Sequence, residues 1–280
     1  MLKSELPNNQ TSVSGLNVLW LTWLISTILL LGVGGTLFLK PAISLSYWPW
    51  LLAPFNTRVL GAVYLSAAIP LISSLIRPRK DSLYLVLAIF SCFTTYFLLV
   101  SIGHIASFSA RKSSSIWFFL YGADSFIGLL FCWRSRRRLI RAGEPSRFAK
   151  LYQFQALILG FYGLGLLLAA PLFGKQFWPW PLDEFHSHLY SGVFITGALG
   201  MGLLSVYSSR FGRLALGITQ AFLGFAIALG NWLVDKQVSK LDWASLDPWL
   251  WQFVFLTFGG LGAWVVIQEL REPVVSEPQG

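Results

Sequence analysis

The segment YWPWLLAPF, from Tyr47 to Phe55, returns 130 positions later as FWPWPLDEF, from Phe177 to Phe185. Each copy follows a long apolar run and places two tryptophans around one proline. Proline lacks an amide donor and ends helices, and indole rings favour the interface between lipid and water. The pattern therefore predicts that each copy is a turn at a membrane surface, between two spans.

The composition is typical of a protein embedded in lipid. Hydrophobic residues make up 55% of the 280 residues and charged residues only 12%. About 20 apolar residues suffice for a helix to cross the hydrocarbon core of a bilayer. Such runs occur at residues 17–39, 57–76, 82–104, 115–133, 151–171, 188–208, 212–234 and 248–268. We therefore expect an all-α, polytopic transmembrane helical bundle of about eight spans. The first run is longer than the core of a signal peptide, which favours an uncleaved first helix.

Lysine and arginine predict the orientation, because short loops that carry them stay on the cytoplasmic side. With both termini inside, the inner segments hold about twice as many Lys and Arg residues as the outer ones. This bias predicts a bacterial-type cytoplasmic (inner) membrane protein with both termini in the cytoplasm. The predicted parts are a tail at 1–16, a four-helix repeat at 17–133, a basic linker at 134–150, a second four-helix repeat at 151–268 and a tail at 269–280.

The two halves align as a tandem repeat. A shift of 130 positions places Trp48-Pro49-Trp50 on Trp178-Pro179-Trp180 and Phe55 on Phe185. Four spans is an even number, so both copies enter the membrane in the same direction. We therefore expect a parallel repeat of four plus four spans, related by an axis near the membrane normal.

The first copy also carries a resemblance to a known group of proteins. The stretch WPWLLAPFNTRVLGA, from Trp48 to Ala62, resembles a motif of uncharacterised bacterial multipass membrane proteins with a Trp-Pro-Trp-x-Leu outer loop. The second half departs from this motif, with Glu184 in place of Pro54 and His188 in place of Arg58. The resemblance implies a membrane protein of unassigned activity, and it supplies no catalytic residue.

Four tryptophans form the first candidate site: Trp48, Trp50, Trp178 and Trp180. We expect them at the outer membrane surface, either as anchors or as the walls of a groove for a lipid, a pigment or a partner helix. Arg58 and His188 occupy equivalent positions in the two repeats. Both are expected to reach the interface or to pair with a lipid phosphate.

Asp124 forms the second candidate site, because an acid inside a span is costly and is often functional. Its place in the fourth span puts it about 13 Å below the outer surface, at the depth of Thr94, Thr95 and Tyr96. These residues could hold a proton or a cation. The alternative is a hydrogen-bonded structural Asp. In the last span of each half the repeat aligns after a further shift of four positions, and Phe258 then takes the place of Asp124.

Histidines and basic residues offer weaker signals. His104, His186 and His188 are all expected near the outer face and are only weak candidates for metal or haem ligands, so we predict no metal site and leave the cofactor unknown. The linker at 134–150 is expected to fix the topology and to attract anionic lipid. Nucleic acid is not expected as a partner, since no soluble module accompanies the charge.

The sequence leaves several functional classes open and carries no catalytic signature. A noncatalytic scaffold or accessory subunit, with a membrane-protein partner, fits the interfacial aromatic residues and the short loops. A secondary transporter of a small solute or ion fits the repeat and Asp124. A lipid-modifying enzyme and a haem or metal protein are further alternatives. An enclosed polar cavity reaching Asp124 would favour transport, and a solid interior with an exposed aromatic groove would favour the scaffold.

Overall fold

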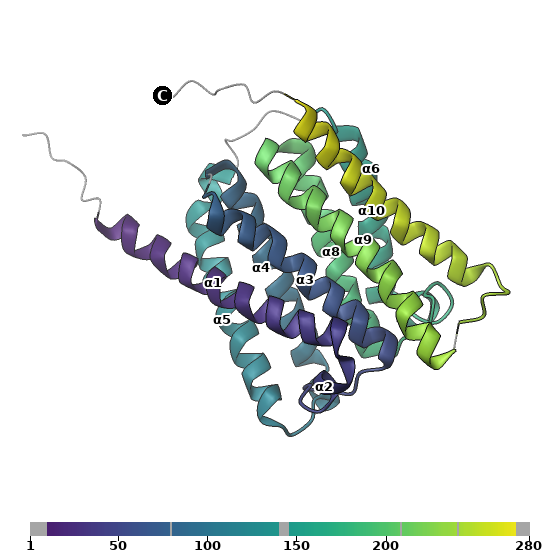
Figure 1. The fold of residues 1–280 in the computed structure, drawn as a ribbon. Helices are drawn as coiled ribbons and strands as arrows, with labels where there is room; N and C mark the ends of the chain where they lie inside the picture. The colour runs from purple at the N-terminus through teal and green to yellow at the C-terminus, as the bar shows by residue number, and fades with distance from the viewer. Residues whose placement is uncertain (1–9, 79, 140–145, 208, 240, 273–280) are drawn as a thin grey trace, which may run out of the picture.

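Helices form the whole of the regular structure in the part of the chain that the computed structural model describes, residues 10–78, 80–139, 146–207, 209–239 and 241–272 (Figure 1). The long helices are α1 (Gln10–Leu39), α3 (Pro54–Ile76), α4 (Lys80–Gly103), α5 (Lys112–Leu139), α6 (Ala149–Leu168), α8 (Glu184–Val206), α9 (Arg210–Val238) and α10 (Asp247–Arg271). The short ones are α2 (Pro41–Leu45), α7 (Ala170–Phe173) and the 3-10 turn η1 (Ile105–Ser107). All eight long helices are apolar and long enough to cross a membrane. The predicted all-α polytopic bundle is confirmed, and the chain is a multi-pass membrane protein.

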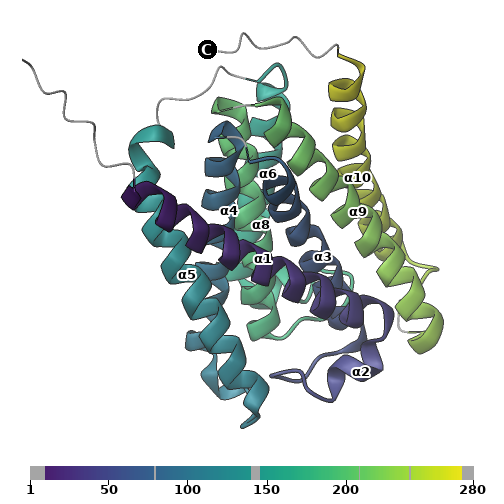
Figure 2. The same ribbon diagram turned by 60° about the vertical axis from the view of Figure 1, so that its left-hand side comes forward.

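Four of the long helices form the centre of the bundle. Half or more of the membrane-crossing part of α3, α4, α8 and α9 is buried, against a third or less for α1, α5, α6 and α10. The central helices contact one another through the pairs α3–α9 and α4–α8. The outer helices each pack on one central neighbour, as α1 on α3, α5 on α4, α6 on α8 and α10 on α9. Figure 2 shows α1 lying obliquely across this bundle.

The two halves share the order of their helices. Each half has a long helix, a short α-helix and then three long helices, and the first half adds the 3-10 turn η1 before its last one. The neighbours also correspond, because α1–α3 matches α6–α8, α4–α5 matches α9–α10, and the two central pairs exchange with each other. Order and neighbours alone do not establish that the backbones superpose, so the tandem repeat stays a prediction.

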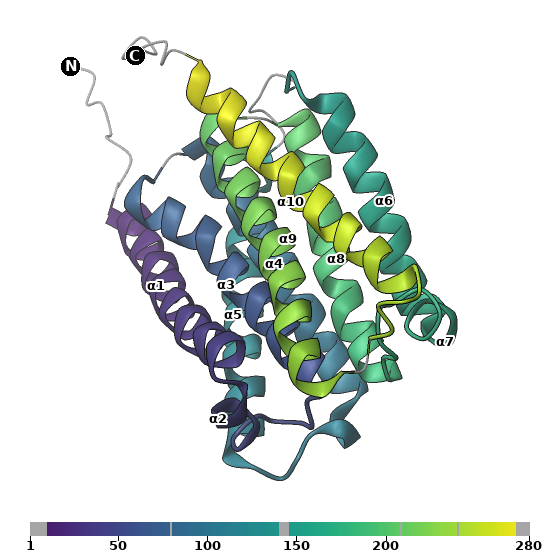
Figure 3. The ribbon, with the colours of Figure 1, turned by 45° about the vertical axis from the view of Figure 1, so that its right-hand side comes forward.

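The first span of each half ends just before a proline, and the Trp-Pro-Trp segment follows it. The α1 helix ends at Leu39 and Pro41 opens α2, while α6 ends at Leu168 and Pro171 lies in α7. Figure 3 shows α2 and α7 at one end of the bundle, with the start of α1 and the end of α10 at the other. Which end faces the cytoplasm stays a prediction.

A buried ion cluster closes the end of the bundle opposite α2 and α7. Glu269 of α10 is fully buried and accepts hydrogen bonds from Arg213 Nε and Nη2 of α9, at 2.8 and 2.9 Å. Arg147, from the basic linker, adds a third contact to Glu269 at 3.0 Å and also reaches Glu272. Part of the linker's charge is therefore paired within the protein. The α5 helix extends into the predicted linker as far as Leu139, and residues 140–145 lie outside the described part.

Candidate functional site

Each Trp-Pro-Trp segment reaches into the other half of the protein. Trp50 Nε1 donates a hydrogen bond to His186 Nε2 at 3.2 Å, and Trp180 Nε1 donates to Asn56 Oδ1 at 2.8 Å. The positions correspond under the predicted shift of 130, which aligns Trp50 with Trp180 and Asn56 with His186. Aromatic contacts also join the two halves. Phe55 stacks on Trp180 with 4.8 Å between ring centroids, and Trp50 packs edge-on against Phe185 at 5.2 Å.

The burial of the four tryptophans contradicts the anchoring alternative, in which their rings lie in the bilayer, whereas the groove alternative stays a prediction and Trp48 does line a pocket. Trp48, Trp50, Trp178 and Trp180 are only 4% to 6% exposed. The rings are therefore packed within the protein: Trp50 and Trp180 contact the other half, while Trp48 and Trp178 pack on aromatic rings of their own half. Other tryptophans are exposed on the helices, among them Trp133, Trp232, Trp249 and Trp264.

Arg58 and His188 also contact protein groups. Arg58 is 7% exposed, and its guanidinium donates a hydrogen bond to the backbone carbonyl of Phe38 at the end of α1. This burial contradicts the expectation that Arg58 reaches the interface. His188 Nδ1 lies 2.9 Å from His104 Nε2, so the two imidazoles join the ends of α8 and α4.

The three histidines do not converge on one point, because His186 contacts Trp50 and Asp183 instead. Among the described residues, no three metal-binding side chains lie close enough to hold a metal ion.

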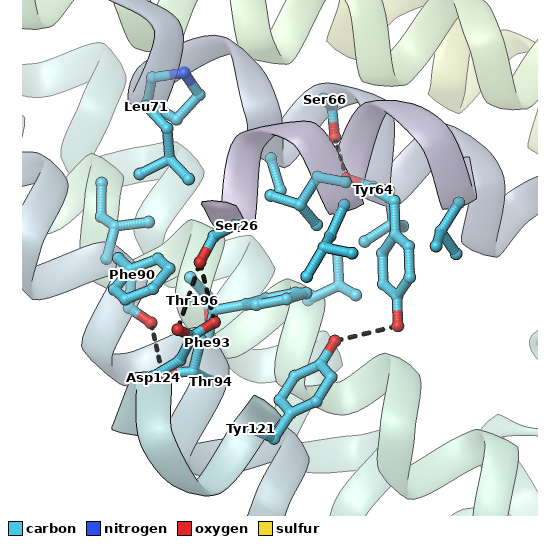
Figure 4. A pocket seen from close by; sticks show the side chains of 18 of the residues that line it. Ser26, Tyr64, Ser66, Leu71, Phe90, Phe93, Thr94, Tyr121, Asp124 and Thr196 are labelled. Atoms are coloured by element: carbon cyan, nitrogen blue, oxygen red, sulfur yellow. Dashed lines mark hydrogen bonds between the residues drawn. The ribbon is translucent and has the colours of Figure 1, made fainter. Parts of the chain in front are cut away.

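A partly open pocket of about 420 Å³ lies between the helices of the bundle, and we call it the central cavity (Figure 4). Its walls come from α1, α3, α4, α5, α8, α9 and α10, and α2 and the first Trp-Pro-Trp turn also contribute. Most of the lining is apolar, including Leu30, Phe90 and Leu223. Tyr64 and Tyr121 also line it, and their hydroxyl oxygens are 2.9 Å apart.

Asp124 faces this cavity from α5. Ser26 Oγ of α1 lies 3.1 and 3.2 Å from its two carboxylate oxygens, and Figure 4 shows the two side chains pointing toward one another. None of the ion pairs found among the described residues includes Asp124. The hydroxyl therefore supports the carboxyl group from one side and leaves it at the wall of the cavity.

Of the three residues predicted to lie beside Asp124, only Thr94 lines the same cavity. Thr94 lines the same cavity, and its hydroxyl donates to the carbonyl of Phe90 at 2.9 Å. The Thr95 hydroxyl is buried without a hydrogen-bond partner and is not part of the cavity wall, and Tyr96 pairs with Ser191 of α8. Consecutive residues of a helix point about 100° apart, so equal depth does not bring three of them to one site.

No protein-family model, curated protein or solved structure matches this chain. A functional assignment therefore has to come from the central cavity and its neighbouring groups.

Proposed function

We propose that this protein is a noncatalytic membrane scaffold or accessory subunit that holds a lipid-like molecule in the central cavity. The cavity itself carries the proposal. Its volume of about 420 Å³ lies within the range of small-molecule sites, about 300 to 1,000 Å³. Its walls are mostly apolar with a few polar groups, which is the usual chemistry of a site for a hydrophobic ligand.

The lining favours binding over chemistry. The lining residues, which belong to the described part, include no His, Lys, Arg or Cys side chain. Asp124 thus has no basic partner in the cavity wall with which it could act as a catalytic pair. This set of side chains can orient an apolar molecule by shape and by a few hydrogen bonds.

Mass spectrometry of the purified protein tests the proposal. The full chain is purified in mild detergent, and its bound small molecules are identified by native mass spectrometry. Ala67 lines the cavity from α3, so Ala67→Phe fills part of the space and is expected to abolish the bound species. Gly122→Phe is the control, because a Cβ at Gly122 on α5 meets nothing within 4 Å and the position is outside the cavity wall. A wild type without any bound apolar molecule, or equal loads in both variants, would contradict the proposal.

A carrier is the second candidate, and Asp124 at the cavity wall favours it. A carrier would need the charge or the proton of this group, while a binding site needs only its hydrogen bond to Ser26. We expect Asp124→Asn to keep that hydrogen bond and to support growth like wild type, under conditions where deletion of the gene is harmful. Loss of growth with normal membrane insertion would favour the carrier.

A further inference from the structure

A second hollow lies on the surface of the bundle, between the end of α9, the start of α10 and the loop that joins them. It is an open groove of about 830 Å³, and it shares no lining residue with the central cavity. Figure 3 shows that the end of α9 and the start of α10 lie at the end of the bundle that holds α2 and α7. We call this hollow the α9–α10 groove.

The α9–α10 groove is polar at one end and apolar at the other. Asp235 and Lys236 line it at the end of α9, while Leu229 and Phe225 line it further along the helix. From Phe225 to Lys236 the helix rises by about 16 Å. Half of the hydrocarbon core of a bilayer is about 15 Å thick. The groove therefore changes from polar to apolar over the thickness of one lipid leaflet.

Three tryptophans form the wall at the polar end: Trp232, Trp243 and Trp249. Trp243 and Trp249 meet edge-on with 5.1 Å between ring centroids, and Trp249 Nε1 donates to the carbonyl of Trp243 at 2.9 Å. Trp243 Nε1 donates in turn to the buried carboxylate of Asp235. These bonds hold the loop in place, while Trp232 and Trp249 stay more than half exposed.

Lys236 supplies the positive charge of the groove. Its Nζ lies 5.5 Å from the centre of the Trp232 ring, one helical turn earlier, and its side chain is exposed. None of the ion pairs found among the described residues includes Lys236. The carboxylate of Asp235 instead accepts from Trp243 and from the amide of Leu241, at 2.8 Å for the amide. An ammonium group beside interfacial tryptophans attracts an anionic group at the membrane surface.

We propose that the α9–α10 groove binds one phospholipid, with its phosphate beside Lys236 and an acyl chain along Leu229 and Phe225. The single negative charge of a phosphodiester matches the ammonium group of Lys236. The tryptophan rings suit the glycerol region between headgroup and chains, because an indole is apolar in its body and polar at its N–H. The proposal concerns a site separate from the central cavity.

Native mass spectrometry of the full chain in mild detergent measures the binding of three probes. These are dioleoylphosphatidylethanolamine, dioleoylphosphatidylglycerol and dioleoylglycerol, which has the same chains without a phosphate. We expect wild type to bind both phospholipids more tightly than dioleoylglycerol. Lys236→Gln should weaken phospholipid binding about fivefold without changing the binding of dioleoylglycerol, and Lys236→Arg should bind like wild type.

Two further variants serve as controls. Lys175 is exposed directly after α7, at the same end of the bundle, and does not line the groove. Lys175→Gln removes the same charge, so it should bind the phospholipids like wild type. Ala67→Phe fills part of the central cavity and should also keep phospholipid binding, since Ala67 is not a groove residue.

Three results would overturn the proposal. They are equal affinity of wild type for phospholipids and dioleoylglycerol, equal weakening by Lys236→Gln and Lys175→Gln, and loss of phospholipid binding in Ala67→Phe. The first two leave the proposed function intact, because they concern only the groove. The third would place the phospholipid in the central cavity, so it would support the proposed function while the groove proposal fails.

Discussion

At the scale of single residues, the hydrogen bonds of His186 define the tautomer of its ring. Trp50 Nε1 can only donate, so His186 Nε2 must accept, and the proton of the neutral ring lies on Nδ1. From there it is donated to Asp183 Oδ2 at 2.7 Å. Asp183, His186 and Trp50 thus form a continuous chain from the surface of the second half to the interior of the first.

We expect His186→Ala to lower the free energy of unfolding by about 1 to 3 kcal/mol, because the buried Trp50 N–H loses its acceptor. His186→Asn should retain most of the stability, since Asn56 accepts from Trp180 at the aligned position. Steric trapping in detergent micelles measures the free energy of unfolding of both variants. Equal losses in the two would show that the acceptor is not what matters.

Asp183 makes stability depend on pH. Partial burial acts to raise its pKa, but hydrogen bonds from the imidazole and the backbone N–H of His186 outweigh this, so the pKa is lowered. A carboxyl group with a lowered pKa contributes stability that is present above its unfolded pKa and is lost as the pH falls through its folded pKa. The side chain is 62% exposed, so the contribution is small.

We therefore expect the stability difference between wild type and Asp183→Asn to shrink as the pH falls from about 5 to about 3. Asn keeps the N-cap acceptor for the amide of His186, so the variant isolates the charge. Thermal unfolding in detergent over this pH range measures the difference. A difference independent of pH would argue against a lowered pKa.

The sequence identified Asp124 but not its partner. An acidic residue stands out in an apolar span, because its burial in the membrane is costly and therefore rare. Ser26 is 98 positions away on another helix, and a serine in a span is too common to stand out. Side-chain direction within a helix likewise separates Thr94 from Thr95 and Tyr96, which depth alone had grouped.

At the scale of helices, glycine sets how closely α9 and α10 approach. A Cβ added at Gly224 would lie 2.5 Å from the carbonyl oxygen of Phe255 and 2.6 Å from the amide nitrogen of Gly259. These are backbone atoms and cannot rotate away. Small residues at such crossings allow the close packing on which helix association in lipid depends.

We expect Gly224→Ala to separate α9 from α10 and to lower the free energy of unfolding by about 1 to 3 kcal/mol, as for other overpacked sites. Gly260→Ala on α10 is the control, because an added Cβ there meets nothing within 4 Å. Steric trapping in micelles measures the free energy of unfolding of the two variants. A loss of the same size at Gly260 would point to helix flexibility instead of contact.

At the scale of the whole molecule, the spans could be predicted but their neighbours could not. A helix needs about 20 apolar residues to cross the bilayer, and such a run is recognised from neighbouring residues in the sequence alone. The packing of α3 on α9 and of α4 on α8 depends on surfaces far apart in the chain. The sequence predicted the tryptophans at the membrane surface for the same reason. Composition shows that an indole favours an interface, but the residues that bury it lie far away in the chain.

We expect both termini to be cytoplasmic. Cysteines at Pro78, in the turn between α3 and α4, and at Ala244, between α9 and α10, lie at exposed positions at opposite ends of the bundle. With Cys92 and Cys132 replaced by serine, a membrane-impermeant maleimide should label Ala244→Cys in intact cells and Pro78→Cys only after lysis. The reverse pattern would invert the orientation.

The hydrogen bonds of Trp50 and Trp180 with the opposite half also determine when during biosynthesis the first half can complete its packing. Trp50 is made 136 residues before its acceptor His186. At a synthesis rate of about 5 to 20 residues per second, its N–H waits roughly 7 to 27 s for that partner. The fourth span, α5, is complete only at Leu139, so late in this interval the first four spans expose the aromatic surface that Phe185 and His186 later cover. A nascent chain stalled before α8 should therefore be captured by the insertion machinery or by quality-control proteases, and release should coincide with the emergence of His186.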